Sequence, residues 1–449
     1  MSLQALKKKL PGPVWNQLRQ IKKQLRKIKK HTIDRYRKKK IVRVMQAKHN
    51  RWVEELKGKK QIKVVFLAIH KSVWKVDTVY QKMVGDAFFE PEILVCPYVQ
   101  FGEERMRDDL DQTYDYFEQK GYSVKRSLKN DGSWVQLEEL HPDLVVFTNP
   151  YELTRREYYL DAYSRYLSCY VPYYYMATNH AGNPEKELDM PVLNAMWRIY
   201  WPHRYIFEQF AAVSQVRGKN SKLTGYPATE ALIKDDLAAR EEVWKAQGEK
   251  KKKIIYAPHH TISDDNSSLS TFLRLGLDMK KIAEQYNDSV QWSFKPHPIL
   301  KSKLYLHPAW GRVRTDKYYD FWSSQAYAQL DEGEYQDLFI QSDAIIHDCS
   351  SFIVEYAVTQ KPALYLVNRV GGDLTFLNDF GRCAFQAYQT ADSAPEINEF
   401  VLDVVRNNRP RAKYDNPCLD EYLSEFYSSE MPSDRIIKDI KVALGATVS

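Results

Sequence analysis

The chain has 449 residues, of which 44% are apolar, and a formal net charge of +8. A chain of this length can bury two ordinary cores, so we expect two domains. No window approaches the apolar length that crosses a bilayer, and the first residues lack the apolar core of a signal peptide. The sequence therefore predicts a protein that does not span a membrane, is not exported by that route and stays in the cytoplasm.

The five cysteines show no paired spacing. They predict neither a disulfide framework nor a thiolate zinc site, and we expect them to be small buried residues. They are Cys96, Cys169, Cys349, Cys383 and Cys418.

Residues 1–60 form a basic arm. They contain 21 Lys or Arg and three acidic residues, a balance of +18, whereas the rest of the chain sums to −10. Apolar residues recur in the arm at helical steps, with basic residues around them. The apolar set is Val14, Leu18, Ile21, Leu25 and Ile28. This pattern favours a basic amphipathic helix that docks on an anionic membrane surface. There are two alternatives. The arm could be a helix that packs on the protein's own core or on a partner, or it could bind nucleic acid, for which the chain has no recognition-module signature.

The next part of the chain predicts a parallel sheet. Buried strands are expected at residues 62–69, 93–97 and 144–148, and they are separated by stretches with helical spacing such as 105–120. Strands that alternate with helices predict a Rossmann-like α/β domain.

Residues 151–215 are rich in tyrosine and contain a polar loop around His180. Clustered tyrosines usually pack in cores, and they are also what a polyol or sugar acceptor stacks on. A base that deprotonates an acceptor hydroxyl needs a pKa near neutral, which favours histidine. His180 is therefore the candidate general base.

Two apolar runs in the second half end in proline and histidine. Each predicts a strand whose polar residues lie at the carboxyl edge of a sheet, where open α/β folds bind ligands. The residues at the first end are Tyr256, Pro258, His259 and His260, and those at the second are Lys295 and His297.

A third apolar run leads through Asp348 into Ser350 and Ser351, which open a helix. Free backbone N–H groups and the helix dipole bind phosphate at such a junction, and the hydroxyls add donors. Glu355 lies one turn on from Ser351 and projects from the same helix end. The alternative is that the serines only cap the helix.

These three segments, in this order, resemble the CDP-glycerol glycerophosphotransferases, the family that polymerises teichoic-acid and capsule backbones. The family carries Tyr-Ala-Pro, Lys/Arg-x-His-Pro and Ser-Asp-x-x-Ile-x-Asp-Tyr-Ser-Ser segments. This chain has Tyr256-Ala257-Pro258, Lys295-Pro296-His297-Pro298 and the run from Ser342 to Glu355. The resemblance implies a GT-B fold, in which two Rossmann-like α/β domains face a central cleft, here preceded by the basic N-terminal helix.

The chain departs from the family pattern in the donor pocket. His259-His260-Thr261 stands where the family has Thr-Trp-Arg, Cys349 replaces a tyrosine and Glu355 replaces an aspartate. The resemblance therefore supports the fold and a site for a nucleotide diphosphate more strongly than it supports the identity of the transferred group. The donor could differ from CDP-glycerol.

The predicted catalytic residues are His180 and His297. The resembling family keeps its general base in a Trp-His-Gly motif that this chain lacks, so His180 matches by position only. We expect no cofactor, and no protein-bound metal because tight Asp/Glu pairs are absent from the three strand ends. The predicted donor and phosphate contacts are Tyr256, Pro258, His259, His260, Lys295, Asp348, Ser350, Ser351 and Glu355.

The predicted order of domains is the arm at 1–60, an acceptor domain at 61–215, a nucleotide-donor domain at 216–425 and a helix at 426–449 that returns to the first domain. The predicted activity is transfer of a glycerol-phosphate-like polyol phosphate from a CDP-linked donor to a growing polymer or lipid-linked acceptor. The enzyme would work at the inner face of the cell membrane and bind no nucleic acid. The alternatives are a GT-B nucleotide-sugar glycosyltransferase, in which Glu355 contacts ribose, and a catalytically silent binding protein of the same fold.

Overall fold

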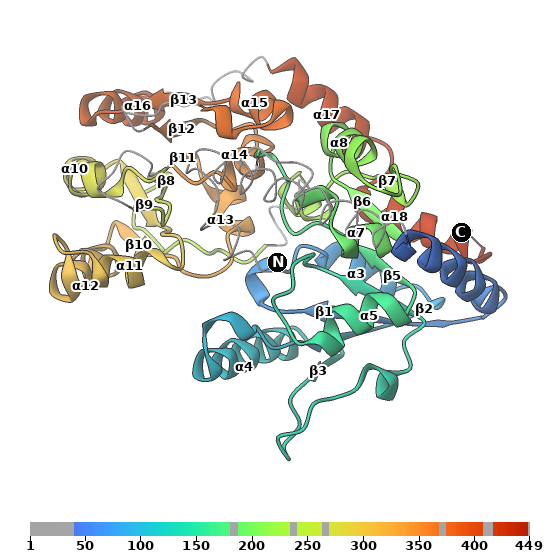
Figure 1. The fold of residues 1–449 in the computed structure, drawn as a ribbon. Coiled ribbons are helices and arrows are strands. Elements are labelled where there is room, and N and C mark those ends of the chain that lie inside the picture. The colour runs from blue at the N-terminus through green and yellow to red at the C-terminus, as the bar shows by residue number, and fades with distance from the viewer. Residues whose placement is uncertain are drawn as a thin grey trace, which may run out of the picture.

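The computed structural model describes residues 40–179, 187–233, 240–262, 269–367, 374–406 and 416–447. Two parallel β-sheets, one in each half of the chain, are covered by helices (Figure 1). The strands of the first are β1 Ile62–Ala68, β2 Phe89–Val95, β3 Val124–Arg126, β4 Leu144–Phe147, β5 Ser168–Tyr170, β6 Arg198–Trp201 and β7 Ser221–Leu223. Those of the second are β8 Lys252–Ala257, β9 Val290–Phe294, β10 Ala328–Leu330, β11 Ala344–His347, β12 Ala363–Leu366 and β13 Gln389–Ala391.

The helices alternate with the strands. Those of the first half are α3 Asp77–Val84, α4 Glu103–Gln119, α5 Leu160–Arg165, α7 Pro191–Ala195 and α8 Arg204–Val213. Those of the second half are α9 Glu230–Ile233, α10 Phe272–Gln285, α11 Leu300–Leu306, α12 Gly311–Ser324, α13 Gln336–Gln341, α14 Phe352–Ala357, α15 Asp379–Phe385, α16 Ala394–Arg406, α17 Pro417–Tyr427 and α18 Pro432–Ala443. None of the described helices is long and apolar enough to cross a membrane.

The two sheets have the same topology. Their strand orders are β3-β2-β1-β4-β5-β6-β7 and β10-β9-β8-β11-β12-β13. In each sheet the strand order therefore reverses beside the first strand, β1 or β8. The strands read as continuous apolar runs because helices cover both faces, and β4 and β9 are buried throughout. The predicted strands and the Rossmann-like parallel sheets are confirmed. In such sheets ligands bind at the point of reversal, here between β1 and β4 and between β8 and β11.

The first sheet continues beyond residue 215, where the sequence predicts the end of the first domain. Three-residue β7 pairs with β6, with Ile199 opposite Ser221. A strand this short has no measurable periodicity, so its register is fixed by the neighbouring strand alone.

The last helix returns to the first domain, as the sequence predicts. Ile436 and Ile440 of α18 join the core cluster under α3, and Lys441 pairs with Asp86 at 2.7 Å. In Figure 1, α18 accordingly lies beside the first sheet rather than the second.

Part of the basic arm is also attached to the first domain. Residues 40–56 form a helix whose Met45 and Leu56 are buried in the two cores of that domain. Packing on the protein's own core, one of the alternatives for the arm, therefore applies to residues 40–56. The amphipathic stretch from Val14 to Ile28 lies outside the described residues.

The tyrosines after residue 151 are mainly core residues. Tyr158, Tyr159, Tyr163 and Tyr170 are buried in the core of the first domain. Tyr175 is buried where the two halves of the chain meet. Core packing therefore accounts for them, and an acceptor-stacking role does not follow from their number.

The cysteine prediction was wrong for one pair. Cys383 of α15 and Cys418 of α17 form a disulfide, while Cys96, Cys169 and Cys349 are free and buried. The bonded residues are 35 positions apart, and the packing of α15 against α17 brings them together. Sequence spacing therefore carried no signal of the bond.

The packing of helix 40–56 can be tested with two adjacent side chains. Met45 is 4% exposed and Val44 is 45% exposed. We expect Met45→Ala to lower the free energy of unfolding by about 2 to 3 kcal/mol because it leaves a cavity. Val44→Ala should change it by less than about 0.5 kcal/mol. Urea denaturation measures both, and equal small losses would mean that the helix does not pack.

Candidate functional site

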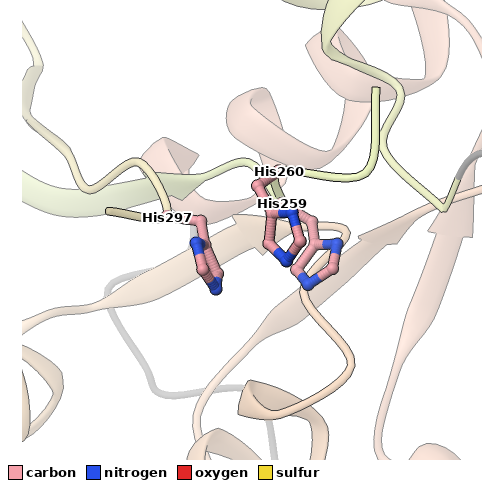
Figure 2. Close-up of side chains that lie close together, drawn as sticks. All are labelled: His259, His260 and His297. Atoms are coloured by element: carbon pink, nitrogen blue, oxygen red, sulfur yellow. The ribbon is translucent and has the colours of Figure 1, made fainter. Parts of the chain in front are cut away.

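Three histidines meet at the carboxyl edge of the second sheet. His259 and His260 follow β8, and His297 follows β9, its parallel neighbour. The ring centroids of His259 and His260 are 4.3 Å apart, and that of His297 lies 4.1 Å from His260 and 5.1 Å from His259. Figure 2 shows the three rings extending from their two loops to the same side. The structure thus brings together three residues predicted from separate motifs.

The histidines are predominantly neutral near pH 7. Burial first, and then neighbouring imidazoles and Lys303, lower the pKa of His259 and His297 to about 3. Burial and Lys303 also lower the pKa of His260. The rings therefore act through hydrogen bonds rather than through charge.

The proton positions follow from the loop contacts. The Ile299 N–H donates to Nδ1 of His297 at 3.3 Å, and the Thr261 N–H donates to Nδ1 of His259 at 3.4 Å. A neutral imidazole whose Nδ1 accepts carries its proton on Nε2. His259 and His297 therefore present Nε2–H donors, for which the described residues offer no partner, to an oxygen ligand.

The cluster could also supply metal ligands. One ring nitrogen from each histidine lies within 4.8 Å of the others, and imidazole suits transition metals. However, Lys303 acts electrostatically on all three rings, so it repels a cation and attracts an anion there. The electrostatics favour an anionic ligand, and the absence of a protein-bound metal stays a prediction.

Asp348 is fully buried and ties two loops of the site together. Its carboxylate accepts hydrogen bonds from the N–H groups of His259 and Thr271 and, at 2.9 Å, from the Thr271 hydroxyl. Burial raises its pKa to about 6, although these hydrogen bonds oppose the rise. Asp348 therefore positions the His259 loop, and its burial contradicts the predicted direct contact with the donor.

Tyr256 and Pro258 are structural as well. Tyr256 is fully buried on β8 and stacks on Phe294. The Pro258 carbonyl accepts the N–H of His297 at 3.0 Å and so joins the two histidine loops. Burial excludes the predicted donor contact for the Tyr256 side chain.

Ser350 and Ser351 lie in the turn between β11 and α14. Ser351 occupies the N-cap position, but its side chain makes no capping hydrogen bond and its hydroxyl lies 3.0 Å from Sγ of Cys349. The hydroxyl of Ser350 has no hydrogen-bond partner among the described residues. Capping does not explain the two serines, and the Ser350 hydroxyl is available to a ligand.

A buried charged cluster joins the two domains beside these serines. Lys75, in the loop after β1, donates to the Tyr335 hydroxyl at 2.7 Å and lies 4.5 Å from the centre of its ring. Lys295 donates to the Gly333 carbonyl at 2.6 Å and lies 5.9 Å from the same ring. Burial raises the pKa of Glu355, and Lys75 and Tyr335 oppose that rise.

Both lysines of this cluster are buried beside carboxylates. Lys75 interacts electrostatically with Glu355, and Lys295 interacts with Asp331 and Glu334. Oε2 of Glu355 has no hydrogen-bond partner among the described residues. Glu355 lies in the first turn of α14, which Ser351 precedes at the N-cap, and its carboxyl interacts with Lys75 and Tyr335.

Lys75 was not predicted from the sequence. The one available signal was a basic residue shortly after the first strand. His70 in the same loop caps a short 3-10 helix, because its Nδ1 accepts the Ser72 N–H at 3.1 Å.

His180, the predicted general base, lies outside the described residues. The segment just before it reaches the second domain, since the Asn179 N–H donates to the Phe376 carbonyl at 2.6 Å. Its amide also donates to the Leu377 carbonyl at 3.0 Å.

Residues 177–370 match the model of a protein family described as CDP-Glycerol:Poly(glycerophosphate) glycerophosphotransferase. The resemblance to this family is confirmed. The matched segment contains the histidine loops, the serine turn and the position of His180.

Two curated relatives come from Staphylococcus aureus (strain NCTC 8325 / PS 47). They are the teichoic acid ribitol-phosphate polymerases TarK and TarL, each 24% identical over 240 residues. The match covers 51% of this chain, 42% of TarK and 39% of TarL. The chain thus spans about two fifths of the length of the curated relatives that it matches.

Solved structures share the fold. The wall teichoic acid polymerase TagF superposes with a TM-score of 0.55 at 15% identity, over 95% of this chain and 99% of that chain. MnaA from S. aureus, in a co-structure with UDP, gives 0.54 at 14% identity, over 87% of this chain and 98% of that chain. The predicted GT-B arrangement of two Rossmann-like domains is confirmed, whereas its basic N-terminal helix lies outside the described residues.

We expect nucleotide binding to depend on pH through the ionisation of Lys295. Burial, opposed by Asp331 and Glu334, lowers its pKa to about 8. Because only the charged form attracts a diphosphate, the affinity for CDP should fall by up to about tenfold from about pH 7 to about pH 9. Isothermal titration across this range measures the change. Lys295→Arg keeps its charge and should flatten the profile, so an equal fall in both proteins would assign the titration to another group.

The serine hydroxyls should contribute to phosphate binding. Ser350→Ala combined with Ser351→Ala is expected to weaken CDP binding by about 1 to 3 kcal/mol, since hydrogen bonds to a charged group are lost. Backbone N–H groups remain, so the loss is partial. The matched control is Ser323→Ala with Ser324→Ala at the end of α12. Unchanged affinity by titration, with an unchanged circular dichroism spectrum, would remove the serines from the site.

Proposed function

We propose that the chain is a transferase that moves a polyol-phosphate unit from a CDP-linked donor to a growing cell-surface polymer of the teichoic-acid or capsule type. The observation that carries this proposal is that uncommitted hydrogen-bond donors and buried cations follow the carboxyl ends of β1, β8, β9 and β11, the strands around the two reversal points. They are the imidazoles of His259 and His297, the hydroxyl of Ser350, and Lys295 with Lys75. Such a set suits a diphosphate.

The reaction would join an acceptor hydroxyl to the phosphorus that carries the polyol. The new bond forms from the hydroxyl oxygen to that phosphorus, the bridging phosphoanhydride bond breaks, and CMP leaves with the bond's electron pair. Lys295, Lys75 and the Nε2–H groups would stabilise the charge that grows on CMP without a metal ion. His180 would accept the hydroxyl proton as general base from the first domain.

Two alternatives use the same fold. In a nucleotide-sugar glycosyltransferase, Glu355 would contact ribose and no phosphate would move; the UDP co-structure of a fold neighbour is the observation on its side. A catalytically silent protein would bind nucleotide without turnover. Phosphorus NMR of the product separates these, because only the proposed reaction makes a phosphodiester. A glycosidic product, or nucleotide binding without any product from CDP-glycerol or CDP-ribitol, would overturn the proposal.

His297 should matter for rate more than for stability. Removal of its Nε2–H donor is expected to lower turnover of the CDP-linked donor by about 100-fold or more, as for other positioned donors to a developing charge. His297→Ala should leave the melting temperature nearly unchanged because the ring lies at the sheet edge. His307→Ala, at the end of α11 and outside the histidine cluster, is the control. Near wild-type turnover in His297→Ala would exclude it from catalysis.

We also propose that residues 1–39 hold the enzyme at the inner face of the cell membrane. They contain 14 Lys or Arg and one acidic residue, and each basic residue near an anionic surface contributes about 1 kcal/mol. Deletion of residues 1–39 retains helix 40–56, so the protein should stay folded and turn over a soluble acceptor. Its co-sedimentation with anionic vesicles should collapse, and that of the full chain should weaken as salt rises. Equal sedimentation of both proteins would refute docking by the arm.

A further inference from the structure

Two large apolar side chains protrude from one corner of the second domain, where α11 ends and α12 begins. Leu306 is 86% exposed and Val313 is 72% exposed, more than any other leucine or valine of the described residues. The backbone between them forms a tight turn, in which the N–H groups of Trp310 and Gly311 both donate to the His307 carbonyl at 3.0 Å. Single exposed apolar residues are common on protein surfaces, so the surroundings decide whether these two mark an interaction surface.

Positive charge accompanies the two apolar side chains. Residues 300–317 contain five Lys or Arg and one acidic residue, whereas the chain after residue 60 is acidic overall. The acidic residue, Asp316, is already engaged, since it accepts the Tyr305 hydroxyl at 2.6 Å and lies 4.0 Å from Lys301. Three of the basic residues are exposed and form no ion pair with any described residue. They are Arg312, Arg314 and Lys317.

Ring contacts hold the two arginines at the corner. The guanidinium of Arg312 lies 4.5 Å from the centre of the Tyr305 ring, which belongs to α11. That of Arg314 lies 4.6 Å from the centre of the Trp310 ring, and it donates to the Ala309 carbonyl at 2.8 Å. Their charges therefore stay beside the apolar side chains and are not neutralised there.

The next most exposed valine lacks this unpaired charge. Val442 of α18 is 62% exposed. The preceding Lys441 is paired with Asp86 at 2.7 Å, and Lys438, one turn earlier, is paired with Glu430 at 3.0 Å. The corner between α11 and α12 thus combines strong apolar exposure with unpaired positive charge, and Val442 does not.

We propose that the corner between α11 and α12 docks on an anionic membrane surface, with its two apolar side chains inserted among the lipids and its three unpaired basic residues at the headgroups. Apolar insertion and attraction to anionic lipid act together at such interfaces. The corner belongs to the second domain and lies at the opposite end of the view from helix 40–56, so it is a surface apart from the basic arm (Figure 1). The proposal does not rest on the transfer reaction.

Docking at this corner would bring the donor edge to the membrane. α11 begins three residues after His297, and the six steps from Leu300 to Leu306 span about 9 Å of helix. Lys303, between them, acts on all three rings of the histidine cluster. A docked corner would therefore hold the cluster near the lipid surface, where a lipid-linked acceptor of the proposed reaction lies.

A fluorophore at a single position of the full chain separates this surface from the arm. An environment-sensitive nitrobenzoxadiazole group on Leu306→Cys should shift its emission to shorter wavelength when vesicles of phosphatidylglycerol and phosphatidylcholine are added. The same group on Val442→Cys is the control and should shift little. The described free cysteines are buried, so labelling is directed to the new position. No shift at position 306 while the protein co-sediments with the vesicles would overturn the proposal.

Co-sedimentation of unlabelled variants measures the two contributions separately. Leu306→Ser combined with Val313→Ser should weaken the partition by about tenfold or more at low and at high salt, because apolar burial is not screened. Arg312→Gln combined with Arg314→Gln and Lys317→Gln should weaken it by about tenfold or more at low salt and little at high salt. Val442→Ser should leave the partition nearly unchanged. Equal partition of the wild-type and both corner variants would refute docking there.

The competing occupant of the corner is a second copy of the chain. Sedimentation velocity without lipid tests this. We expect the wild-type and Leu306→Ser with Val313→Ser to show the same state at every concentration. A dimer that forms with rising concentration and is lost in this variant would assign the surface to self-association instead of a membrane.

Discussion

The geometry of the donor site depends on one buried carboxylate. Asp348, at the end of β11, holds the loop after β8 and the start of α10 through the N–H groups of His259 and Thr271. A carboxylate this deep is stable only because three donors satisfy it. Its side chain is fully buried, so its contribution is to hold the His259 loop beside the His297 loop.

Burial also decides how the site carries charge. The imidazoles lose their protons to solvent far below neutral pH, so they serve as directed N–H donors. Positive charge comes instead from Lys303, which acts on the three rings, and from Lys295 and Lys75, which lie at Tyr335. An arrangement of neutral donors near the ligand and lysines behind them can bind an anion without holding a cation of its own.

The first domain contributes residues that contact the second domain directly. Lys75 reaches Tyr335, and Asn179 reaches the loop before α15, while α18 returns from the second domain to the core of the first. These contacts join residues far apart in the chain and make the donor edge a product of both domains. A ligand that neutralises Lys75 and Lys295 together would therefore also stabilise the contact between the domains.

The sequence by itself determined the strands, their parallel arrangement and the polar residues at their carboxyl ends, because hydrophobic periodicity and strand-end chemistry are local properties. It also led to the family, through three short motifs in order. The tertiary structure alone decided which of those side chains are buried and which remain open to a ligand. Tyr256 and Asp348 belong to the predicted motifs and yet are buried, whereas Lys75 belongs to none and lies at the site.

The same division applies elsewhere in the molecule. The disulfide between Cys383 and Cys418, strand β7 and the packing of helix 40–56 all depend on partners that local sequence does not specify. Hydrophobic periodicity indicates which face of a segment is buried, but it does not indicate which other segment packs against that face. That information exists only once distant segments have packed together.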